Sequence, residues 1–367
     1  MNDNAIRALA FYLPQYHPIP ENDAWWGRGF TEWTNVAKAR PQFRGHYQPH
    51  LPSDTGFYDL RLPEARQLQA DLAREHGVSG FCYYHYWFTG RRVLERPFAD
   101  VLARGEPDFP FCLCWANEDW TRAWDGRTGD YLLQQHYSEA DDLAHIRALA
   151  PAFADSRYVR VVAKPLFLVY RASRIPDPLR TTTTWREEAA RLGIGELYLC
   201  RVESFGSEHT DPAALGFDAA VEFQPDWTLL GRPMHRDFTR RALWKLGLNR
   251  SAFQRHRIYD YAATRAMMLA KPEPPYLRFP CVTPMWDNTA RRKADAAIFH
   301  RSTPALYEQW LRTVAERVAQ RPAEQRLLFI NAWNEWAEGN HLEPDQRWGR
   351  AYLEATRRVL GREEQRA

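Results

Sequence analysis

The sequence predicts a single (β/α)8 barrel, a fold in which eight parallel strands alternate with helices. Three observations lead to this prediction. Eight short apolar runs show no alternation, helical patterns lie between them, and each run ends in aromatic or polar residues. Apolar runs of this kind are typical of parallel strands that are covered on both faces. We therefore expect one catalytic domain over residues 1–367.

The eight expected strands are spread over the whole chain. They are Ile6–Tyr12, Gly80–Tyr84, Phe111–Trp115, Pro165–Tyr170, Glu196–Arg201, Ala219–Phe223, Cys281–Met285 and Leu327–Trp333. An open doubly wound sheet is the structural alternative, and it usually has a glycine-rich phosphate turn after its first strand. That position reads Leu13-Pro-Gln-Tyr-His-Pro, which cannot cradle a phosphate. The closed barrel is therefore favoured.

Helical patterns fill the connections between these strands. Residues 63–76 carry Leu68 and Leu72 at helical spacing, with Pro63 near the start and Gly77 after the end, as expected of a helix. Similar patterns predict helices at Ala140–Ala154, Thr184–Leu192, Ser251–Leu269 and Pro304–Ala319. Strand alternating with helix, eight times over, indicates a closed (β/α)8 barrel in a single domain.

Two long insertions follow the first and the sixth strand, at about residues 13–62 and 224–280. In a barrel both leave from the C-terminal face, where active sites form. The second contains a basic stretch from Arg232 to Arg257, with eight Arg or Lys residues and one acid, Asp237. Two interpretations stay open, a solvated helical surface or a contact for an anionic glycan or another acidic partner.

The composition narrows the possible partners. Hydrophobic residues make up 45% of the chain, enough for a sizeable core, and 15 tryptophans contribute to an aromatic share of 14%. Surplus aromatic rings indicate either an aromatic-rich core or a cleft that stacks on the apolar faces of sugars. The net charge of +3 is too small for a polyanion-binding protein. We expect a glycan as partner and no nucleic acid.

The cysteines and the N-terminal residues indicate the cellular compartment in which we expect the protein. Cys82, Cys112, Cys114, Cys200 and Cys281 are expected as buried free thiols in a reducing compartment. The C-x-C pair is a poor zinc site without a second pair nearby. No basic segment followed by an apolar run opens the chain, and no stretch approaches 18 apolar residues. We expect no membrane span and a cytoplasmic protein, or a periplasmic or secreted one if a signal peptide has been removed.

Polar and aromatic residues gather just after the strand ends, which a barrel brings together at one mouth. The expected substrate-binding residues are Tyr12, Gln15, His17, Tyr84, His85, Trp87, Trp115, Asn117, Glu118, Trp120, Glu203, Glu222, Trp286, Asp287, Asn334 and Trp336. Arg122, Trp124 and Asp125 follow the third strand as well. Three roles stay open for Glu203, Glu222 and Asp287: binding of sugar hydroxyls, electrostatic support of the site, and a purely structural role.

The expected catalytic residues are Glu335 and Glu338, at the end of the eighth strand. Glycoside cleavage needs two carboxyl groups in different protonation states. Glu335 lies between Trp333 and Trp336 in the sequence, and apolar rings raise the pKa of a carboxyl group. A separation of three residues brings both groups to one side of a helical turn or into one cleft. Glu118, in a second Asn-Glu pair, is a competing candidate.

Other mechanisms fit the sequence less well. It contains no G-x-S-x-G nucleophile elbow, no phosphate-binding P-loop and no H-E-x-x-H zinc motif. No Asp-x-Asp pair follows an apolar strand, which weakens the case for a metal-dependent glycosyltransferase. We therefore expect no metal site.

Six segments carry a resemblance to a known family. They are Ala10-Phe-Tyr-Leu-Pro-Gln-Tyr-His17, Gly29-Phe-Thr-Glu-Trp-Thr-Asn35, Tyr84-His-Tyr-Trp-Phe88, Phe111-Cys-Leu-Cys-Trp-Ala-Asn-Glu118, Trp333-Asn-Glu-Trp-Ala-Glu-Gly339 and Leu342-Glu-Pro-Asp345. Through them the chain resembles the WbsX-like proteins, often labelled glycosyltransferases. Those proteins in turn resemble glycoside hydrolase family 99, the endo-α-mannanases and endomannosidases.

The resemblance implies a retaining hydrolase that needs no metal or organic cofactor. Glu335 would be the base that takes the proton from the 2-hydroxyl of the sugar, and Glu338 the acid that protonates the leaving oxygen. A 1,2-anhydro sugar would be the intermediate, which requires a mannose- or rhamnose-configured α-glycoside, for example in a bacterial O-antigen. A glycosyltransferase of surface-polysaccharide synthesis is the alternative. A binding-only barrel is a third possibility, against which the paired carboxylates argue.

Overall fold

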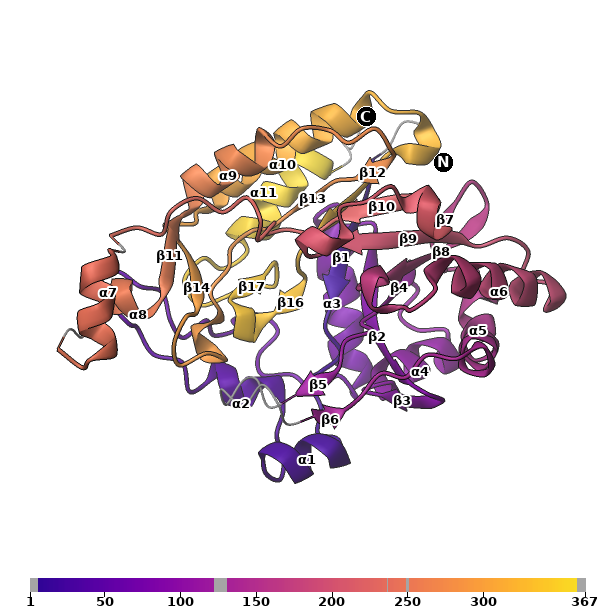
Figure 1. Ribbon diagram of the computed structural model, residues 1–367, viewed down its shortest axis with the longest axis horizontal. Helices are drawn as coiled ribbons and strands as arrows, with labels where there is room; N and C mark the ends of the chain where they lie inside the picture. The colour runs from indigo at the N-terminus through magenta and orange to yellow at the C-terminus, as the bar shows by residue number, and fades with distance from the viewer. Residues whose placement is uncertain (1–5, 122–130, 236, 249–250, 362–367) are drawn as a thin grey trace.

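The computed structural model describes residues 6–121, 131–235, 237–248 and 251–361, and its centre is a closed parallel barrel (Figure 1). The barrel strands are β1 (Arg7–Tyr12), β2 (Gly80–Phe88), β4 (Phe111–Trp115), β8 (Lys164–Val169), β9 (Tyr198–Glu203), β10 (Ala219–Glu222), β12 (Arg278–Phe279) with β13 (Cys281–Val282), and β15 (Leu327–Ile330). Each pairs in parallel with the next, and β15 returns to β1.

The ring closes at Pro280, which separates β12 from β13. Val221 of β10 is paired with Phe279, and Cys281 is paired with Phe329 of β15. Proline has no N–H to donate to a sheet, but its carbonyl oxygen accepts from the Phe329 N–H at 2.8 Å. The seventh strand therefore changes partner at the proline. This closure confirms the predicted (β/α)8 barrel and excludes the open sheet.

Aromatic rings fill the centre of the barrel. The ring centroid of Phe11 on β1 lies 5.6 Å from that of Tyr84, 5.7 Å from that of Phe223 and 5.5 Å from that of Phe329. These four residues come from four different strands or strand ends. The packed interior is a core rather than a channel, as in other barrels of this size. It forms the floor on which the C-terminal loops rest.

Helices surround the barrel (Figure 1). They are α3 (Pro63–Glu75), α4 (Arg96–Arg104), α5 (Glu139–Ala154), α6 (Pro178–Arg191), α9 (Tyr261–Leu269), α10 (Pro304–Ala319) and α11 (Ala351–Leu360). The predictions for α3, α5 and α10 are confirmed, whereas α4 and α11 were not predicted. Helix α6 begins six residues before its predicted start at Thr184, because the side chain of Asp177 caps it by accepting from the Arg180 N–H.

Two of the expected alternations are wrong. Only the short 3-10 turns η3 (Gly206–Glu208) and η4 (Pro212–Leu215) connect β9 to β10. The helix predicted over residues 251–269 is interrupted by strand β11 (Arg257–Asp260), which pairs with β14 (Ala297–His300). That pairing buries Ile258 and Tyr259, so tertiary contacts override the helical pattern.

The loops at the C-terminal ends of the strands carry the remaining elements. The first insertion holds α1 (Pro20–Trp26) and α2 (Glu32–Val36), and the second holds α7 (Phe238–Lys245) and α8 (Ala252–Arg255), which lie far from the barrel at the left of Figure 1. Short strands complete the loops: β3 (Arg91–Val93), β5 (Trp120–Thr121), β6 (Tyr131–Leu133), β16 (Asn334–Glu335) and β17 (Asn340–His341). Strand β7 (Arg160–Val161) pairs with β8 before the barrel strand begins.

The cysteines are as expected. All five cysteines are buried and free of disulfides. Among the residues that the structure describes, no helix combines the length and apolar character needed to cross a bilayer.

Candidate active site

Glu335 and Glu338 lie in a tight hairpin beyond the end of β15. Strand β16 pairs antiparallel with β17, and the 3-10 turn η7 (Trp336–Glu338) connects them. Gly339 ends this turn with φ at +54°, and a Cβ there would lie 2.8 Å from the backbone oxygen of Asp287. The glycine is therefore required both by the left-handed backbone and by the close approach of the next loop.

The two tryptophans of this segment are anchored below it by Glu343. Its carboxylate accepts the indole N–H of Trp333 at 3.1 Å and that of Trp336 at 2.6 Å. Tyr58 and Gln69 donate to the same carboxylate at 2.8 and 2.6 Å. Trp336 is thus a buried support and does not line the cleft. The structure does not bring Trp336 to the cleft as expected, and Trp333 does not line it either.

Asn334 fixes the same segment to the loop after β1. Its side-chain oxygen accepts the Leu13 N–H at 2.7 Å, and its amide donates to the Leu13 carbonyl at 3.1 Å. Tyr16 donates to the carbonyl of Asn334 and accepts the N–H of Trp336 at 3.2 Å. Asn334 is fully buried, so it positions its neighbour Glu335 instead of lining the cleft.

One arginine holds both glutamates. The guanidinium of Arg291 lies 3.3 Å from Glu335, 2.8 Å from Glu338 and 2.8 Å from Glu32, measured between nitrogen and oxygen atoms. Glu32 is completely buried at the start of α2. Sequence reasoning missed this contact, because Arg291 is 259 residues from Glu32 and no spacing connects them. The segment Gly29–Asn35, already noted for its resemblance, was the only signal.

These contacts set the protonation of the pair. Burial is the main cause that raises the pKa of Glu335 to about 8; Arg291 opposes the shift, and the charges of Glu338 and Glu32 add to it. Burial likewise raises the pKa of Glu338 against the effect of Arg291. With the raised pKa of both glutamates, the pair retains a proton near neutral pH. The site can therefore present a proton donor and a carboxylate together.

The two glutamates open into a cleft of about 610 Å³, a size typical of small-molecule and sugar sites. Of the residues expected from the sequence, the cleft is lined by Gln15, Tyr84, Glu118, Trp120, Trp286, Glu335 and Glu338. Further aromatic residues that were not expected also line it: Trp25, Trp26, Tyr86, Tyr170, Phe205, Phe223 and Trp227. Arg122, Trp124 and Asp125 lie outside the described residues.

Several expected residues are buried away from the cleft and bind other protein groups. Tyr12 donates to Gln69 at 2.6 Å, and the indole of Trp87 donates to Asp141 at 3.0 Å. The remaining four do the same: His17 bonds to the Pro14 carbonyl, His85 to His145, Trp115 to the Trp87 carbonyl and Asn117 to the Arg171 carbonyl. These side chains shape the loops that carry the cleft, and the structure does not bring them to its surface.

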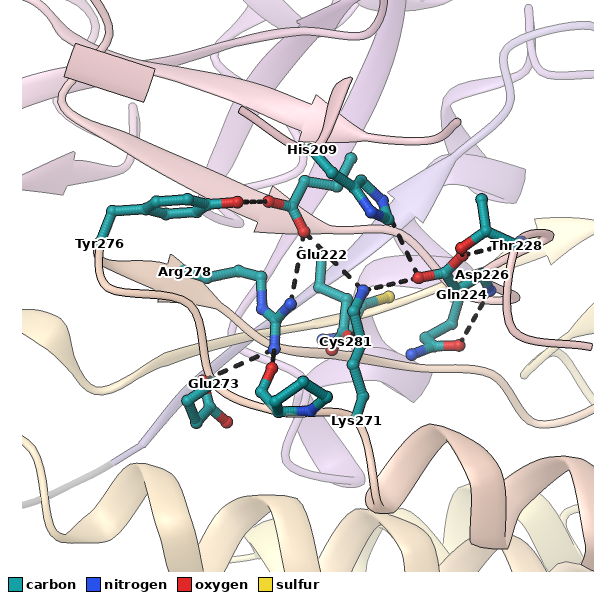
Figure 2. Close-up of polar contacts among 12 residues, drawn as sticks. His209, Glu222, Gln224, Asp226, Thr228, Lys271, Glu273, Tyr276, Arg278 and Cys281 are labelled. Atoms are coloured by element: carbon teal, nitrogen blue, oxygen red, sulfur yellow. Dashed lines mark hydrogen bonds and ion pairs between the residues drawn. The ribbon is translucent and has the colours of Figure 1, made fainter. Parts of the chain in front are cut away.

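Glu203 and Glu222 belong to a separate buried cluster (Figure 2). The ammonium nitrogen of Lys271 lies 2.6 Å from Asp226, 3.4 Å from Glu222 and 3.8 Å from Glu203. Tyr276 donates to Glu203 at 2.6 Å, and Arg278 lies 3.5 Å from it. Glu222 also accepts the Cys281 N–H at 3.3 Å. The cluster ties β9 and β10 to the closing strand, which makes both glutamates structural.

Asp287 supports Glu338 from behind. Its carboxylate is 2.5 Å from the Nε2 atom of His46, and its backbone N–H donates to the Glu338 carbonyl at 2.6 Å. Burial works to raise the pKa of Asp287, but the hydrogen bond and charge of His46 lower it overall. Asp287 does not line the cleft, so its contact with Glu338 is a positioning one.

One group of possible metal ligands occurs among the described residues. Ligand atoms of His50, His341 and Asp345 lie within 4.8 Å of one another. His341 donates its Nδ1–H to the Glu343 carbonyl at 3.0 Å, and its Nε2 then accepts from His50 Nδ1, also at 3.0 Å. The hydrogen bond between the two rings occupies Nδ1 of His50 and Nε2 of His341. We interpret the group as a contact between the first insertion and β17.

Comparison with known proteins places the chain in a family. The profile described as Glycosyltransferase WbsX matches residues 8–356. Two relatives, each described as an uncharacterized protein WxcX, come from two strains of Xanthomonas campestris pv. campestris. They are 46% and 47% identical over 361 residues, covering 96% of this chain and 49% of theirs. The chain thus spans about half the length of these curated relatives.

Solved structures share the fold. A glycoside hydrolase-like protein has a TM-score of 0.58 at 13% identity and covers 97% of this chain and 94% of its own. A GH99 endo-alpha-mannosidase from Bacteroides thetaiotaomicron has a TM-score of 0.55 at 15% identity, covering 98% and 97%. The structural likeness extends over nearly the whole barrel, and the match over residues 8–356 shows that this chain belongs to the WbsX family.

Proposed function

We propose that this chain is a glycoside hydrolase that uses Glu335 and Glu338 to cleave an α-linked, mannose- or rhamnose-configured glycan. The observation that carries the proposal is the carboxylate pair itself. Both groups line one cleft at the C-terminal mouth of the barrel, and one arginine holds them there. Glycoside cleavage needs a proton donor and a carboxylate at the same bond. The barrel and its insertions would form one catalytic domain.

The cleft wall supports a sugar as the ligand. Five tryptophans line it, among them two pairs of neighbouring rings, with centroids 5.9 Å apart for Trp25 and Trp120 and 5.1 Å apart for Trp227 and Trp286; the fifth is Trp26. Flat rings bind the C–H faces of sugars, while polar groups between them hold the hydroxyls. A bacterial surface polysaccharide such as an O-antigen fits the likeness to a family 99 fold, and endo or exo cleavage is decided by how such a chain enters the cleft.

The proposed mechanism retains the anomeric configuration. Glu335 removes the proton from the 2-hydroxyl, whose oxygen displaces the leaving group and forms a 1,2-anhydro sugar. Glu338 protonates the departing oxygen and then activates the water that opens the three-membered ring. The two steps consume one water and return both carboxyl groups to their starting protonation. The chemistry requires O2 and the leaving group to be trans, as in α-mannosides and α-rhamnosides.

The pKa of Glu335 gives these roles a consequence. A base whose pKa is raised to about 8 must lose its proton before it can act. We therefore expect kcat/KM to increase with pH up to about 8. A profile that instead falls as the pH approaches 8 would assign the roles in the opposite order, with Glu335 as the acid.

The test is a screen of bacterial O-antigen polysaccharides and α-mannans, with sizing of the products. Hydrolysis by the wild-type protein and its absence in the Glu338→Gln variant would support the proposal. Product sizes would separate endo from exo cleavage. Cleavage of these polymers by the variant at the wild-type rate would contradict it.

The family description supports one rival, a glycosyltransferase of surface-polysaccharide synthesis. Such an enzyme would consume a nucleotide-sugar or lipid-linked donor and extend an acceptor, without net hydrolysis. Incubation with the donor, and mass measurement of the acceptor before and after, distinguishes the two activities.

A further inference from the structure

Two arginines of the cleft have no acidic partner. Arg257 and Arg292 both line it, and within the described part of the chain no carboxylate lies within 4.0 Å of either guanidinium. Arg292 is exposed, and the Nε–H of Arg257 is buried without a hydrogen-bond acceptor. A buried donor without an acceptor is unfavourable. Tyr259 hydrogen-bonds to Arg257, and the charge of Arg292 lowers the pKa of Glu338, but neither guanidinium is in an ion pair with a described residue, so both keep N–H donors for a ligand.

The other charged residues of the cleft are already paired or bonded. Arg291 serves the two catalytic glutamates and Glu32. Glu118 is 2.7 Å from Arg171, and Asp119 accepts the N–H of Gln135 at 2.7 Å. Outside these ion pairs, the described surface of the cleft carries two arginines, Arg257 and Arg292, and one acid, Asp119.

Arg257 lies beside aromatic rings that line the cleft. Arg257 begins β11, where its N–H donates to the Ala296 carbonyl at 2.7 Å. Its guanidinium carbon is 6.0 Å from the centre of the Trp227 ring, and that ring lies 5.1 Å from the ring of Trp286. A sugar stacked on these indoles would bring a substituent within reach of the guanidinium.

We infer that the cleft takes a glycan that carries a negatively charged group, a carboxylate or a phosphate, bound by Arg257 and Arg292. This inference rests on the proposed function, because it assumes that the cleft binds the glycan. Arginine is suited to such groups because its fork of N–H donors matches both carboxylate and phosphate oxygens. Within the basic stretch of the second insertion, the inference concerns Arg257 and not the residues of α7. Arg257 enters the cleft, whereas Arg240 and Lys245 are exposed on α7; Arg236 and Arg250 lie outside the described residues.

Three matched probes test the inference by calorimetric titration. They are an α-linked mannose disaccharide, the same disaccharide oxidised at C6 to the uronic acid, and the same disaccharide with a 6-phosphate. All titrations use the Glu338→Gln background, so that no probe is cleaved. Arg257→Gln, Arg292→Gln and the double variant are compared with Arg240→Gln, an exposed arginine on α7.

We expect at least one acidic probe to bind more tightly than the neutral disaccharide, and the stronger of the two identifies carboxylate or phosphate. Each cleft substitution should weaken that probe about tenfold and leave the neutral one unchanged. Arg240→Gln should change neither. Equal binding of acidic and neutral probes, no binding of any probe, or acidic binding insensitive to Arg257 and Arg292 would overturn the inference. Charge-selective binding by a protein that never hydrolyses a glycan would overturn only the proposed function.

Discussion

Two groups of three buried carboxylates lie at the mouth of this barrel, and they differ in access and in charge. Glu32, Glu335 and Glu338 surround Arg291, and Glu335 and Glu338 line the cleft. Glu203, Glu222 and Asp226 surround Lys271, with Arg278 and Arg201 beside Glu203. Figure 2 shows Lys271 between Glu222 and Asp226. The second group adjoins a cavity of about 20 Å³ at Glu222, which is too small for a sugar ring.

The two groups differ in the number of cations that accompany their three acids. In the first group one cation serves three acids, and burial raises the pKa of Glu335 to about 8. In the second group three cations match three acids. Burial works to raise the pKa of Asp226, but the hydrogen bond and charge of Lys271 lower it overall. The first group raises the pKa of its cleft-lining acids, as the proposed function requires, whereas the second lowers the pKa of Asp226 and holds strands together.

The largest expected effect follows from removing the cation of the structural group. Lys271→Met leaves Glu203, Glu222 and Asp226 without their shared partner. Removing one member of a buried ion pair typically costs about 3–5 kcal/mol, so we expect a loss of this size in urea unfolding. Lys245→Met, an exposed lysine on α7, is the control. A loss below about 1 kcal/mol for Lys271→Met would show that the cluster does not hold the barrel.

The pH dependence of stability should have opposite signs in the two groups. The folded pKa of Glu335 is raised, so stability is present below the unfolded pKa of about 4.3 and is lost as pH rises toward about 8. Glu335→Gln should remove this loss and gain stability on the order of 3 kcal/mol relative to wild type between pH 5 and 8. The folded pKa of Asp226 is lowered. Asp226→Asn should therefore destabilise at pH 7, and the penalty should shrink as pH falls below about 4.

Thermal unfolding of the two variants and of the wild type at pH 3, 4, 5, 7 and 8 measures both effects. Parallel pH dependences for Glu335→Gln and wild type would remove the evidence for a retained proton at Glu335. A penalty for Asp226→Asn that is the same at pH 3 as at pH 7 would contradict the lowered pKa of Asp226.

Arg291 should affect catalysis more than folding. Because its charge lowers the pKa of both glutamates, Arg291→Met should move the rising limb of the kcat/KM profile to higher pH. We expect a loss of about 100-fold at pH 7, with partial recovery in Arg291→Lys. An unchanged profile in Arg291→Met would limit this residue to a structural role.

The smallest effect is expected at Glu118, the competing acid. It lines the cleft but is bound to Arg171, which also contacts Glu208. Glu118→Gln should raise KM by about fivefold with little change in kcat, as expected for a ligand of the ground state. A collapse of kcat in this variant would make Glu118 a member of the acid-base machinery.

Much of the fold was predictable because buried parallel strands read as uninterrupted apolar runs. The run at Phe111–Trp115 coincides with β4. The predicted helix over residues 251–269 failed because strand β11 pairs with a segment 40 residues later, and no local pattern encodes that partner. Asp260 could have predicted where α9 starts, because it caps that helix by accepting the Ala263 N–H at 3.0 Å.

The candidate site was predictable only in part. Glu335 and Glu338 stand close in sequence at a strand end, so spacing could find them. Arg291 reaches them across 44 and 47 residues, and only the folded chain shows the contact. Glu203 and Glu222 also follow strands, and sequence alone could not show that Lys271 closes over them. A residue that directly follows a strand can therefore be predicted to lie near the barrel mouth. Whether its side chain lines the cleft depends on how the insertions fold over it.

The most direct test compares one residue from each group in a single assay. Release of reducing sugar from the best polysaccharide substrate is measured for Glu335→Gln, Glu338→Gln and Glu222→Gln, with Glu316→Gln on the exposed face of α10 as control. The account predicts losses of at least about 1,000-fold for the first two, with intact folding. It predicts activity for Glu222→Gln in proportion to its folded fraction. Full activity in Glu335→Gln or Glu338→Gln would contradict the central claim.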